Sequence, residues 1–414
     1  MSGDVTNRGR VRPVITGLGA IAPTGNDVAA HWASARNGKS ALGVISRFDS
    51  SGYPVRVAGE VRDFIAADHV PSRLLRETDP MTHFALVATR QALNDAGVNL
   101  ADYSDLDLAV ITANSSGGVE FGQQELQKLY QEGPHAVGAY MSIAWFYAAT
   151  TGQLSIRYGM RGPCGVIVSE QAGGLDALGQ ARRVLARGTR MVLAGGTDAS
   201  LSPYGLVCQL ANGLLADGDQ PDRVYLPFDS GAHGYVPGEG GAMFTVEDLS
   251  MARARGVPRI HGELVGYAAT VDPRPGSGSE PGLRRAIEVA LRDAGVTPGQ
   301  VDVVFADGAG VPARDRQEAA AINAVFGSRG VPVTVPKTMT GRLYAGGAPL
   351  DVVTALLAIR DGEIPPTVNI ADPTYAAELD LVRDRPRPAP VRTVLVLARG
   401  FGGFNAAVVL TAVD

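Results

Sequence analysis

The stretch 161–194 constrains the fold of this chain more than any other segment. It begins with a short apolar run at 165–168, which predicts a buried strand, and a helix follows from about Ala172. Apolar residues recur along that helix at helical spacing, and Gly188 supplies a stop signal before a second apolar strand begins at Met191. A strand, a turn, a helix and another strand in this order predict a parallel sheet with helices packed against it.

The turn of this unit is formed by Ser169, Glu170 and Gln171. At such a turn the backbone N–H groups of the helix start point outward above the sheet edge. Enzymes place nucleophiles there, and this chain places Gln171 there. Taken alone, a glutamine at this position is a polar residue that caps the start of a helix.

The chain as a whole predicts two α/β halves of comparable size, because 414 residues exceed the size of most single sheets. We expect the halves to be residues 1–256 and 257–414, joined by a basic helix at 249–255. The other predicted strands are 12–16, 106–112, 301–306, 331–335, 391–397 and 406–411. The other predicted helices are 82–96, 119–130, 283–293 and one that Asn26 or Asp27 caps and that runs through Ala35, and 271–282 is predicted to be a flexible loop.

The segment 141–156 is rich in small and aromatic residues, which is unusual for an exposed helix. Burial at a contact between subunits would explain this composition. The segment is therefore a candidate interface.

Composition excludes several functional classes. A net charge of −5 without a basic cluster gives no indication of nucleic-acid binding. The first twelve residues lack the apolar core of a signal peptide, and no apolar run is long enough to span a membrane. Cys164 and Cys208 cannot form a disulfide framework and are expected to be buried packing residues. We therefore expect a cytoplasmic, soluble protein.

No cofactor or metal site is predicted. Residues 17–22 match the pattern G-x-G-x-x-A of dinucleotide-binding turns, but Pro23 and Gly25 follow where the phosphate-binding helix should run. None of the six histidines is paired with a cysteine or carboxylate at metal-ligand spacing. No G-x-S-x-G pentad of a serine hydrolase occurs.

The turn sequence SEQAGGLDA at 169–177 resembles the nucleophile turn of β-ketoacyl synthases, the condensing enzymes of fatty-acid and polyketide assembly. In that family a cysteine occupies the position of Gln171. This variant resembles the chain length factors, or ketosynthase β subunits, of bacterial type II polyketide synthases. The resemblance runs from about Arg12 to Val413. It implies an α/β thiolase fold, which is a duplicated five-layered αβαβα sandwich.

The resemblance also implies that all three catalytic positions are altered. Condensing enzymes use a thiol and two histidines. The matching segments here are 307–312 (DGAGVP) and 337–342 (KTMTGR), so Asp307 and Arg342 replace the histidines, while Lys337 is retained. The loop 400–406 (GFGGFNA), with Phe401, resembles the family's loop beside the active site. The resemblance thus implies a subunit without a condensing active site of its own.

Each substitution has an ordinary structural interpretation. Asp307-Gly308 is most often a turn, and an isolated arginine such as Arg342 is most often a solvated surface charge. Because all three changes fall on the catalytic positions of one family pattern, we instead expect Asp307 and Arg342 to lie together. The hypothesis is an ion pair that replaces the catalytic groups.

Further expectations come from the family alone. A chain length factor pairs with an active ketosynthase α subunit, is served by an acyl carrier protein, and has the poly-β-ketone in a tunnel at the subunit interface. Family resemblance places the tunnel-lining residues on the helix at 119–130, and these are Val119, Gly122, Gln123 and Leu126. Their spacing puts them on one helix face, although ordinary core packing is the alternative. The small Val119 and Gly122 predict a long tunnel and a long polyketide.

Two other functions stay open. Gln171 resembles the glutamine of decarboxylating priming domains, so the subunit could decarboxylate a malonyl group on the carrier protein. A free-standing thiolase-like scaffold without a ketosynthase partner is the third reading.

Overall fold

The computed structural model describes residues 11–274, 276–375 and 377–413. Most of its strands belong to one mixed sheet of eleven strands, and two small ribbons stand apart. In sheet order the strands are β12 (Asp380–Leu381), β10 (Pro332–Thr334), β9 (Val303–Phe305), β14 (Thr393–Arg399), β15 (Phe404–Thr411), β8 (Gly262–Val271), β1 (Pro13–Ile21), β7 (Gly240–Asp248), β6 (Met191–Asp198), β4 (Leu108–Ala113) and β5 (Cys164–Ile167). The ribbons pair β2 (Gly43–Val44) with β3 (Val57–Ala58) and β11 (Glu363–Ile364) with β13 (Arg387–Pro388).

The sheet contains the same strand pattern twice. The order β5-β4-β6-β7-β1 in the first half matches β10-β9-β14-β15-β8 in the second. In both sets the first two pairings are parallel and the next two antiparallel. β1 and β8 pair with each other and join the sets. This topology confirms the predicted duplication, whereas the division at 256/257, between α9 and β8, stays a prediction.

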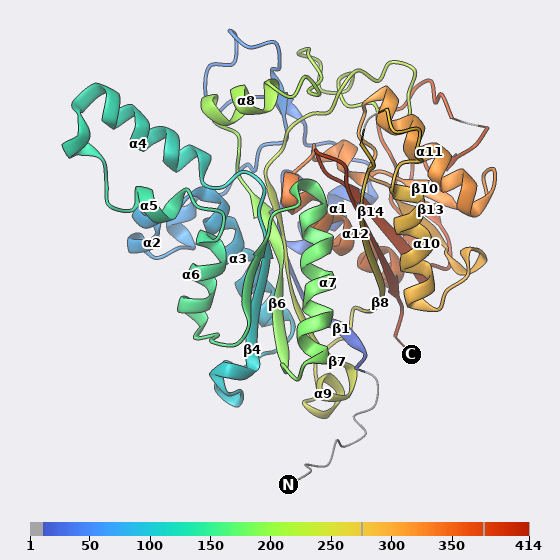
Figure 1. Ribbon diagram of the computed structural model, residues 1–414, viewed down its shortest axis with the longest axis horizontal. Coiled ribbons are helices and arrows are strands. Elements are labelled where there is room, and N and C mark those ends of the chain that lie inside the picture. Colours follow the sequence, from blue (N-terminus) through green and yellow to red (C-terminus); the bar gives the residue numbers. More distant parts are fainter. Residues whose placement is uncertain (1–10, 275, 376, 414) are drawn as a thin grey trace.

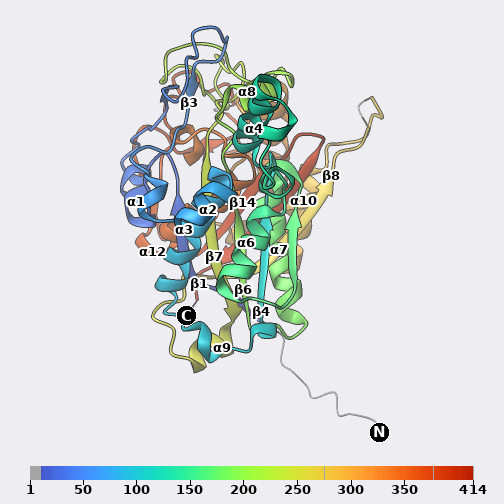
Figure 2. The same cartoon turned by 90° about the vertical axis from the view of Figure 1, so that its left-hand side faces the viewer.

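Helices form the other three layers of the predicted five-layered arrangement (Figures 1 and 2). α7 (Gly173–Ala186) and α12 (Gly347–Asp361) contact strands of both halves and each other, so they form the central layer. α12 is buried along most of its length, as its apolar sequence requires. α3 (Pro80–Asp95) and α6 (Ala149–Tyr158) cover the outer face of the first half, and α10 (Leu283–Ala294) with α11 (Pro312–Phe326) covers the second.

Six further helices complete the described chain: α1 (Val28–Arg36), α2 (Ser72–Glu77), α4 (Val119–Glu132), α5 (Met141–Ala144), α8 (Pro203–Leu210) and α9 (Leu249–Ala254). The predicted cap of α1 is present, since the Asp27 side chain accepts a hydrogen bond from Ala30 N. α10 ends as predicted at Gly295, which has the left-handed conformation that favours glycine. The predicted loop 271–282 begins at the end of β8 and precedes α10, although Pro275 within it lies outside the described residues.

The G-x-G-x-x-A stretch has a packing function. Strand β1 continues through it, so no helix begins there. A Cβ at Gly17 would lie 2.0 Å from the carbonyl oxygen of Ala92, and one at Gly19 would lie 1.8 Å from that of Ala88. These glycines therefore let α3 approach the strand closely.

Two burial predictions are wrong. β5 is an edge strand that pairs only with β4, and its residues are partly exposed rather than buried, as is Val168, which is 49% exposed. Cys164 and Cys208 are exposed rather than core residues. For β5 and Cys164 the cause is that an apolar run indicates burial, but not whether this chain or another one covers the strand. Across the described ranges, no helix combines the length and apolar character needed to cross a membrane.

Candidate functional site

Gln171, Asp307 and Arg342 each lie in a short segment that comes after a strand. Gln171 lies in the short 3₁₀ turn η5 (Glu170–Ala172) that leads from β5 into α7. Asp307 lies two residues after the end of β9 (Val303–Phe305), and Arg342 follows the 3₁₀ turn η7 (Pro336–Met339) after β10. Because β9 and β10 are parallel neighbours, their carboxyl ends meet at the same edge of the sheet. The topology therefore brings Asp307 and Arg342 together.

Asp307 and Arg342 form a buried, bidentate ion pair, which confirms the hypothesis from the sequence. The two terminal nitrogens of Arg342 donate to the two carboxylate oxygens of Asp307 over 3.0 and 2.9 Å. The same nitrogens donate to the carbonyl oxygens of Asp307, at 3.0 Å, and of Arg399, at 3.1 Å. Arg342 is among the largest fully buried side chains, so the interpretation as a solvated surface charge is wrong.

Further polar groups hold Asp307 in place. Its Oδ1 also accepts the backbone N–H of Arg399 over 2.9 Å. The buried carboxylate of Glu318, on α11, accepts the N–H groups of Asp307 and Gly308 over 2.7 and 2.9 Å. The sequence analysis missed Glu318 and Arg399, because no motif named them. Arg399 had one signal, a charged residue at the end of an apolar run, whereas Glu318 stands among other charged residues and had none.

The charges of the pair stabilise each other. Burial alone would raise the pKa of Asp307, but the positive charges of Arg342 and Lys337 outweigh it and hold that pKa below its usual value. Burial would likewise favour a neutral Arg342, but Asp307 raises the pKa of Arg342 well above its usual value. Asp307 therefore stays ionised and Arg342 stays protonated near neutral pH, so Arg342 offers no lone pair to act as a base.

Lys337 lies beneath this pair. Its Nζ donates to the carbonyl oxygen of Ala306 over 2.9 Å and forms an ion pair with Asp351 of α12 at 2.5 Å. The lysine thus ties the end of β9 to the central helix layer. Its role as a retained part of the family framework stays a prediction.

The turn that carries Gln171 is linked to the loop that carries Phe401. Gln171 is buried, with only 5% of its surface exposed. Its neighbour Glu170, which has a φ of 52°, accepts the backbone N–H of Phe401 over 2.6 Å. The Phe401 side chain is 49% exposed. The contact of Glu170 was also not predicted, although this residue stands within the motif.

Neither cysteine could replace a thiol at the turn. Cys164 lies on the edge strand β5 and Cys208 lies on α8. Within the described part of the chain, no group of three or more histidine, cysteine or carboxylate side chains could hold a metal ion.

The four predicted tunnel residues lie on α4, which projects from the body of the molecule (Figure 1). The only residues of α4 that are buried are Gly122 and Glu125. A Cβ at Gly122 would have ordinary contacts with Trp145 and Met141, at 3.8 and 3.9 Å. The Gln123 side chain accepts the N–H of Tyr204, at the start of α8, over 2.8 Å. Gln123 therefore has a structural contact, and lining of a tunnel by these four residues stays a prediction.

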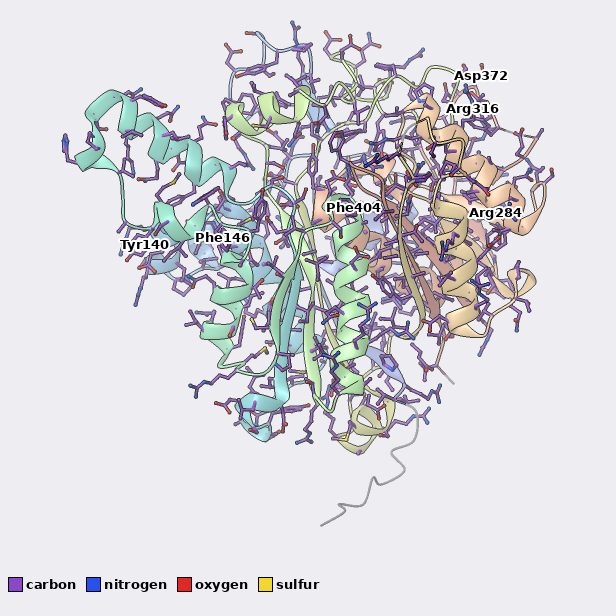
Figure 3. All side chains as sticks on the ribbon, in the orientation of Figure 1. Tyr140, Phe146, Arg284, Arg316, Asp372 and Phe404 are labelled. Atoms are coloured by element: carbon purple, nitrogen blue, oxygen red, sulfur yellow. The ribbon has the colours of Figure 1, made fainter. Side chains whose placement is uncertain are left out.

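A cluster of exposed apolar side chains lies beside α4 on the segment that the sequence analysis singled out. We call it the aromatic patch, and Figure 3 marks two of its members, Tyr140 and Phe146. It consists of Tyr140, Ile143, Trp145, Phe146 and Tyr147. Trp145 is 48% exposed and Phe146 52% exposed. Apolar surface gathered in this way is typical of a protein–protein contact.

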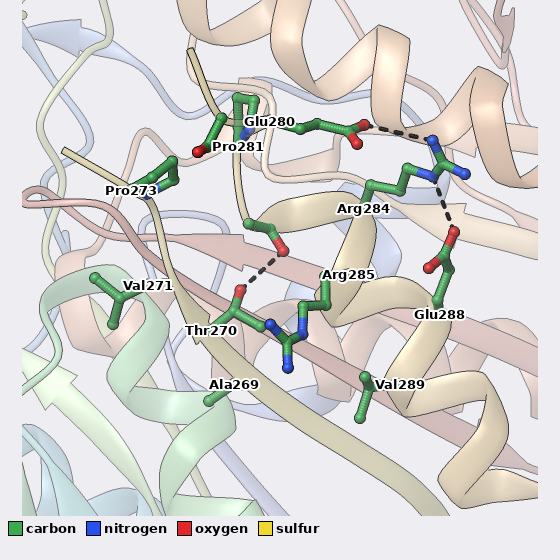
Figure 4. Close-up of a pocket in the computed structure, with 12 residues that line it drawn as sticks. Ala269, Thr270, Val271, Pro273, Glu280, Pro281, Arg284, Arg285, Glu288 and Val289 are labelled. Atoms are coloured by element: carbon green, nitrogen blue, oxygen red, sulfur yellow. Dashed lines mark hydrogen bonds and ion pairs between the residues drawn. The ribbon is translucent and has the colours of Figure 1, made fainter. Parts of the chain in front are cut away.

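A separate cavity of about 760 Å³ lies between the end of β8 and the start of α10 (Figure 4). Most of the charged side chains that line it form ion pairs with one another, because Arg284 pairs with both Glu280 and Glu288. None of the three altered positions and none of the four α4 residues lines this cavity.

Comparison with known proteins identifies similar chains over nearly the whole length. The profile of the β-ketoacyl synthase N-terminal domain matches residues 12–252, and that of the C-terminal domain matches residues 261–371. The actinorhodin polyketide β-ketoacyl synthase 2 of Streptomyces coelicolor is 55% identical over 96% of this chain and 98% of its own. The ketoacyl synthase β subunit of the tetracenomycin polyketide synthase of Streptomyces glaucescens is also 55% identical, over 96% of this chain and 97% of its own.

Solved structures agree with these matches. The ishigamide ketosynthase/chain length factor aligns with a TM-score of 0.89 and 30% identity, over 98% of this chain and 100% of the other. A type II polyketide synthase acyl carrier protein in complex with its ketosynthase bound to the hexaketide aligns with a TM-score of 0.87 and 27% identity, over 98% and 100%. The expected thiolase-like fold is thus confirmed.

Proposed function

Because this chain belongs to the β-ketoacyl synthase family, within the branch of ketosynthase β subunits (chain length factors) of type II polyketide synthases, we propose that it acts by shape rather than by covalent chemistry. It pairs with an active ketosynthase α subunit, and α4 borders the tunnel in which the poly-β-ketone grows. An acyl carrier protein delivers the building blocks to the pair. The buried Asp307–Arg342 pair is the observation that carries this proposal.

The absence of chemistry follows from the groups at the site. An amide such as that of Gln171 cannot attack a thioester. Asp307 holds Arg342 protonated. Neither position 307 nor position 342 therefore offers the neutral base that decarboxylation and condensation need. Loss of a nucleophile alone costs on the order of a million-fold in rate in other enzymes.

Acyl loading tests whether this chain lacks covalent chemistry of its own. We expect the purified chain, incubated alone with acyl and malonyl carrier protein, to gain no acyl mass at the 169–177 turn in peptide mass spectrometry. The exposed Cys164 and Cys208 are read separately, because exposed thiols can react nonspecifically. An acyl group on the turn would contradict the proposal. Release of CO₂ that disappears in Gln171→Ala would instead support the malonyl decarboxylase.

Chain length is tested at Gly122. A phenylalanine there has room for its Cβ, and its ring would extend from the helix face that we assign to the tunnel. We expect Gly122→Phe, paired with the active ketosynthase, to give a shorter polyketide in product mass spectrometry. Gly299→Phe is the matched control, since Gly299 lies in open space between α10 and β9. An unchanged product length with Gly122→Phe would refute the assignment of α4 to the tunnel.

A further inference from the structure

α4 is held in place by polar contacts rather than by apolar burial. It has fourteen residues, yet its buried positions are a glycine and a glutamate. Its packing partners are its own return segment, α5 and α8, rather than the sheet. In contrast, α3 lies on the sheet and buries eleven of its residues. The position of α4 relative to the body therefore depends on a few polar contacts of its first turns: the hydrogen bond from Phe121 N to Asp79, that from Tyr204 N to Gln123, and the ion pair of Glu120 with Arg47 at 3.6 Å.

One buried carboxylate joins these two helices. Asp79 is the N-cap of α3, where its Oδ1 accepts the N–H of Met81 over 3.0 Å. Its Oδ2 accepts the N–H of Phe121, the third residue of α4, also over 3.0 Å. The N-cap of α4 itself, Gly118, has no side chain, so Asp79 supplies the cap from another part of the chain.

The backbone around this contact leaves no room for adjustment. A Cβ at Gly118 would lie 2.9 Å from the Cβ of Asp79 and 2.3 Å from the carbonyl oxygen of Ala144. The loop before Gly118 is fixed by a second buried carboxylate, Asp198, which accepts the N–H groups of Ser115 and Ser116 over 3.1 and 3.2 Å. The entry to α4 is thus rigid, and Asp79 fixes the direction in which the helix leaves it.

We propose that Asp79 is a positioning residue for product length, because it sets the angle at which α4 leaves the body and hence the position of the helix face that we assign to the tunnel. This inference rests on the proposed function. Leu126 lies about 10 Å along the helix from Val119. A tilt at the first turn of α4 moves Leu126 more than Val119. A more mobile first turn therefore varies the tunnel wall more at Leu126 than at Val119.

Asp79→Ser separates the two caps. A serine can still cap α3, because serine is as good an N-cap as aspartate, but its single oxygen cannot bridge two helix starts. Asp27→Ser is the matched control, since Asp27 caps α1 alone and does not touch α4. Both variants are measured as complexes with the active ketosynthase, with carrier protein and malonyl groups supplied.

We expect Asp79→Ser to give a mixture of neighbouring ketide lengths in place of one dominant product, while Asp27→Ser keeps the parent distribution. Amide hydrogen exchange should become about five-fold faster at 119–123, as expected for a lost cap, and stay unchanged in α3. A single unchanged product from an intact Asp79→Ser complex would overturn the inference.

Parallel measurement of Gly122→Phe keeps the two failures apart. If Gly122→Phe shortens the product and Asp79→Ser leaves it unchanged, the positioning role alone is wrong. If neither variant alters the product, the assignment of α4 to the tunnel is wrong, and the inference fails with it. If Asp79→Ser does not assemble, Asp79→Asn replaces it: the asparagine keeps the shape and one acceptor oxygen, and the same product and exchange results decide.

Discussion

Replacing Arg342 with alanine is expected to lower the free energy of unfolding by about 3–5 kcal/mol, because it leaves the buried Asp307 carboxylate without its partner. Urea unfolding followed by circular dichroism measures the loss. Arg360→Ala is the matched control: Arg360 pairs with Asp361 at the surface, where a lost pair costs at most about 1 kcal/mol. Equal effects of the two substitutions would show that the pair at the site is not desolvated.

Removing both charges should cost less than removing either. The double variant Asp307→Leu, Arg342→Leu leaves no unpaired ion, so its loss should be smaller than that of Arg342→Ala.

The pH dependence of the free energy of unfolding has a defined sign. The pKa of Asp307 is lowered in the folded state. The contribution of its ionised form to the free energy of unfolding is therefore complete above the pKa of the unfolded chain, about 3.8, and is lost as the pH falls below that value.

Trp145→Asp is expected to weaken pairing with the active ketosynthase by about 30-fold or more. Replacement of a large aromatic side chain at the centre of an interface has an effect of this size. The reason is that a carboxylate would have to be desolvated within the aromatic patch. Titration of labelled subunits by fluorescence anisotropy measures the dissociation constant. Val271→Asp is the control, since Val271 is also an exposed apolar residue but lies on β8, in the other half of the sheet. Unchanged affinity for Trp145→Asp would place the interface elsewhere.

Much of the site could be predicted from the sequence, because it depends on local order along the chain. Asp307 follows a strand and Arg342 lies a fixed distance after the next, so a parallel pair of strands brings them together. The contacts that surround the pair could not be predicted. Glu318 reaches Asp307 from a helix, and Glu170 reaches Phe401 across more than two hundred residues. Such contacts depend on how layers stack, which periodicity does not report.

The fold was predictable to a similar depth. Apolar periodicity located the strands and helices that flank α7, but β8, β7 and α12 were not predicted. α12 is apolar on all sides and lacks the one-sided pattern of a surface helix. The exposure of β5 was missed for the opposite reason: its apolar residues predict burial that this chain alone does not provide.

The Asp307–Arg342 pair also limits how this lineage can change. If a mutation placed a neutral side chain at either position, the remaining charge would be left unpaired in the interior at a cost of several kcal/mol. Such a loss is a large fraction of a typical protein's free energy of unfolding, which is about 5–15 kcal/mol. The pair therefore resists single substitutions, and relatives of this subunit are expected to vary at α4 more readily than at Asp307 or Arg342.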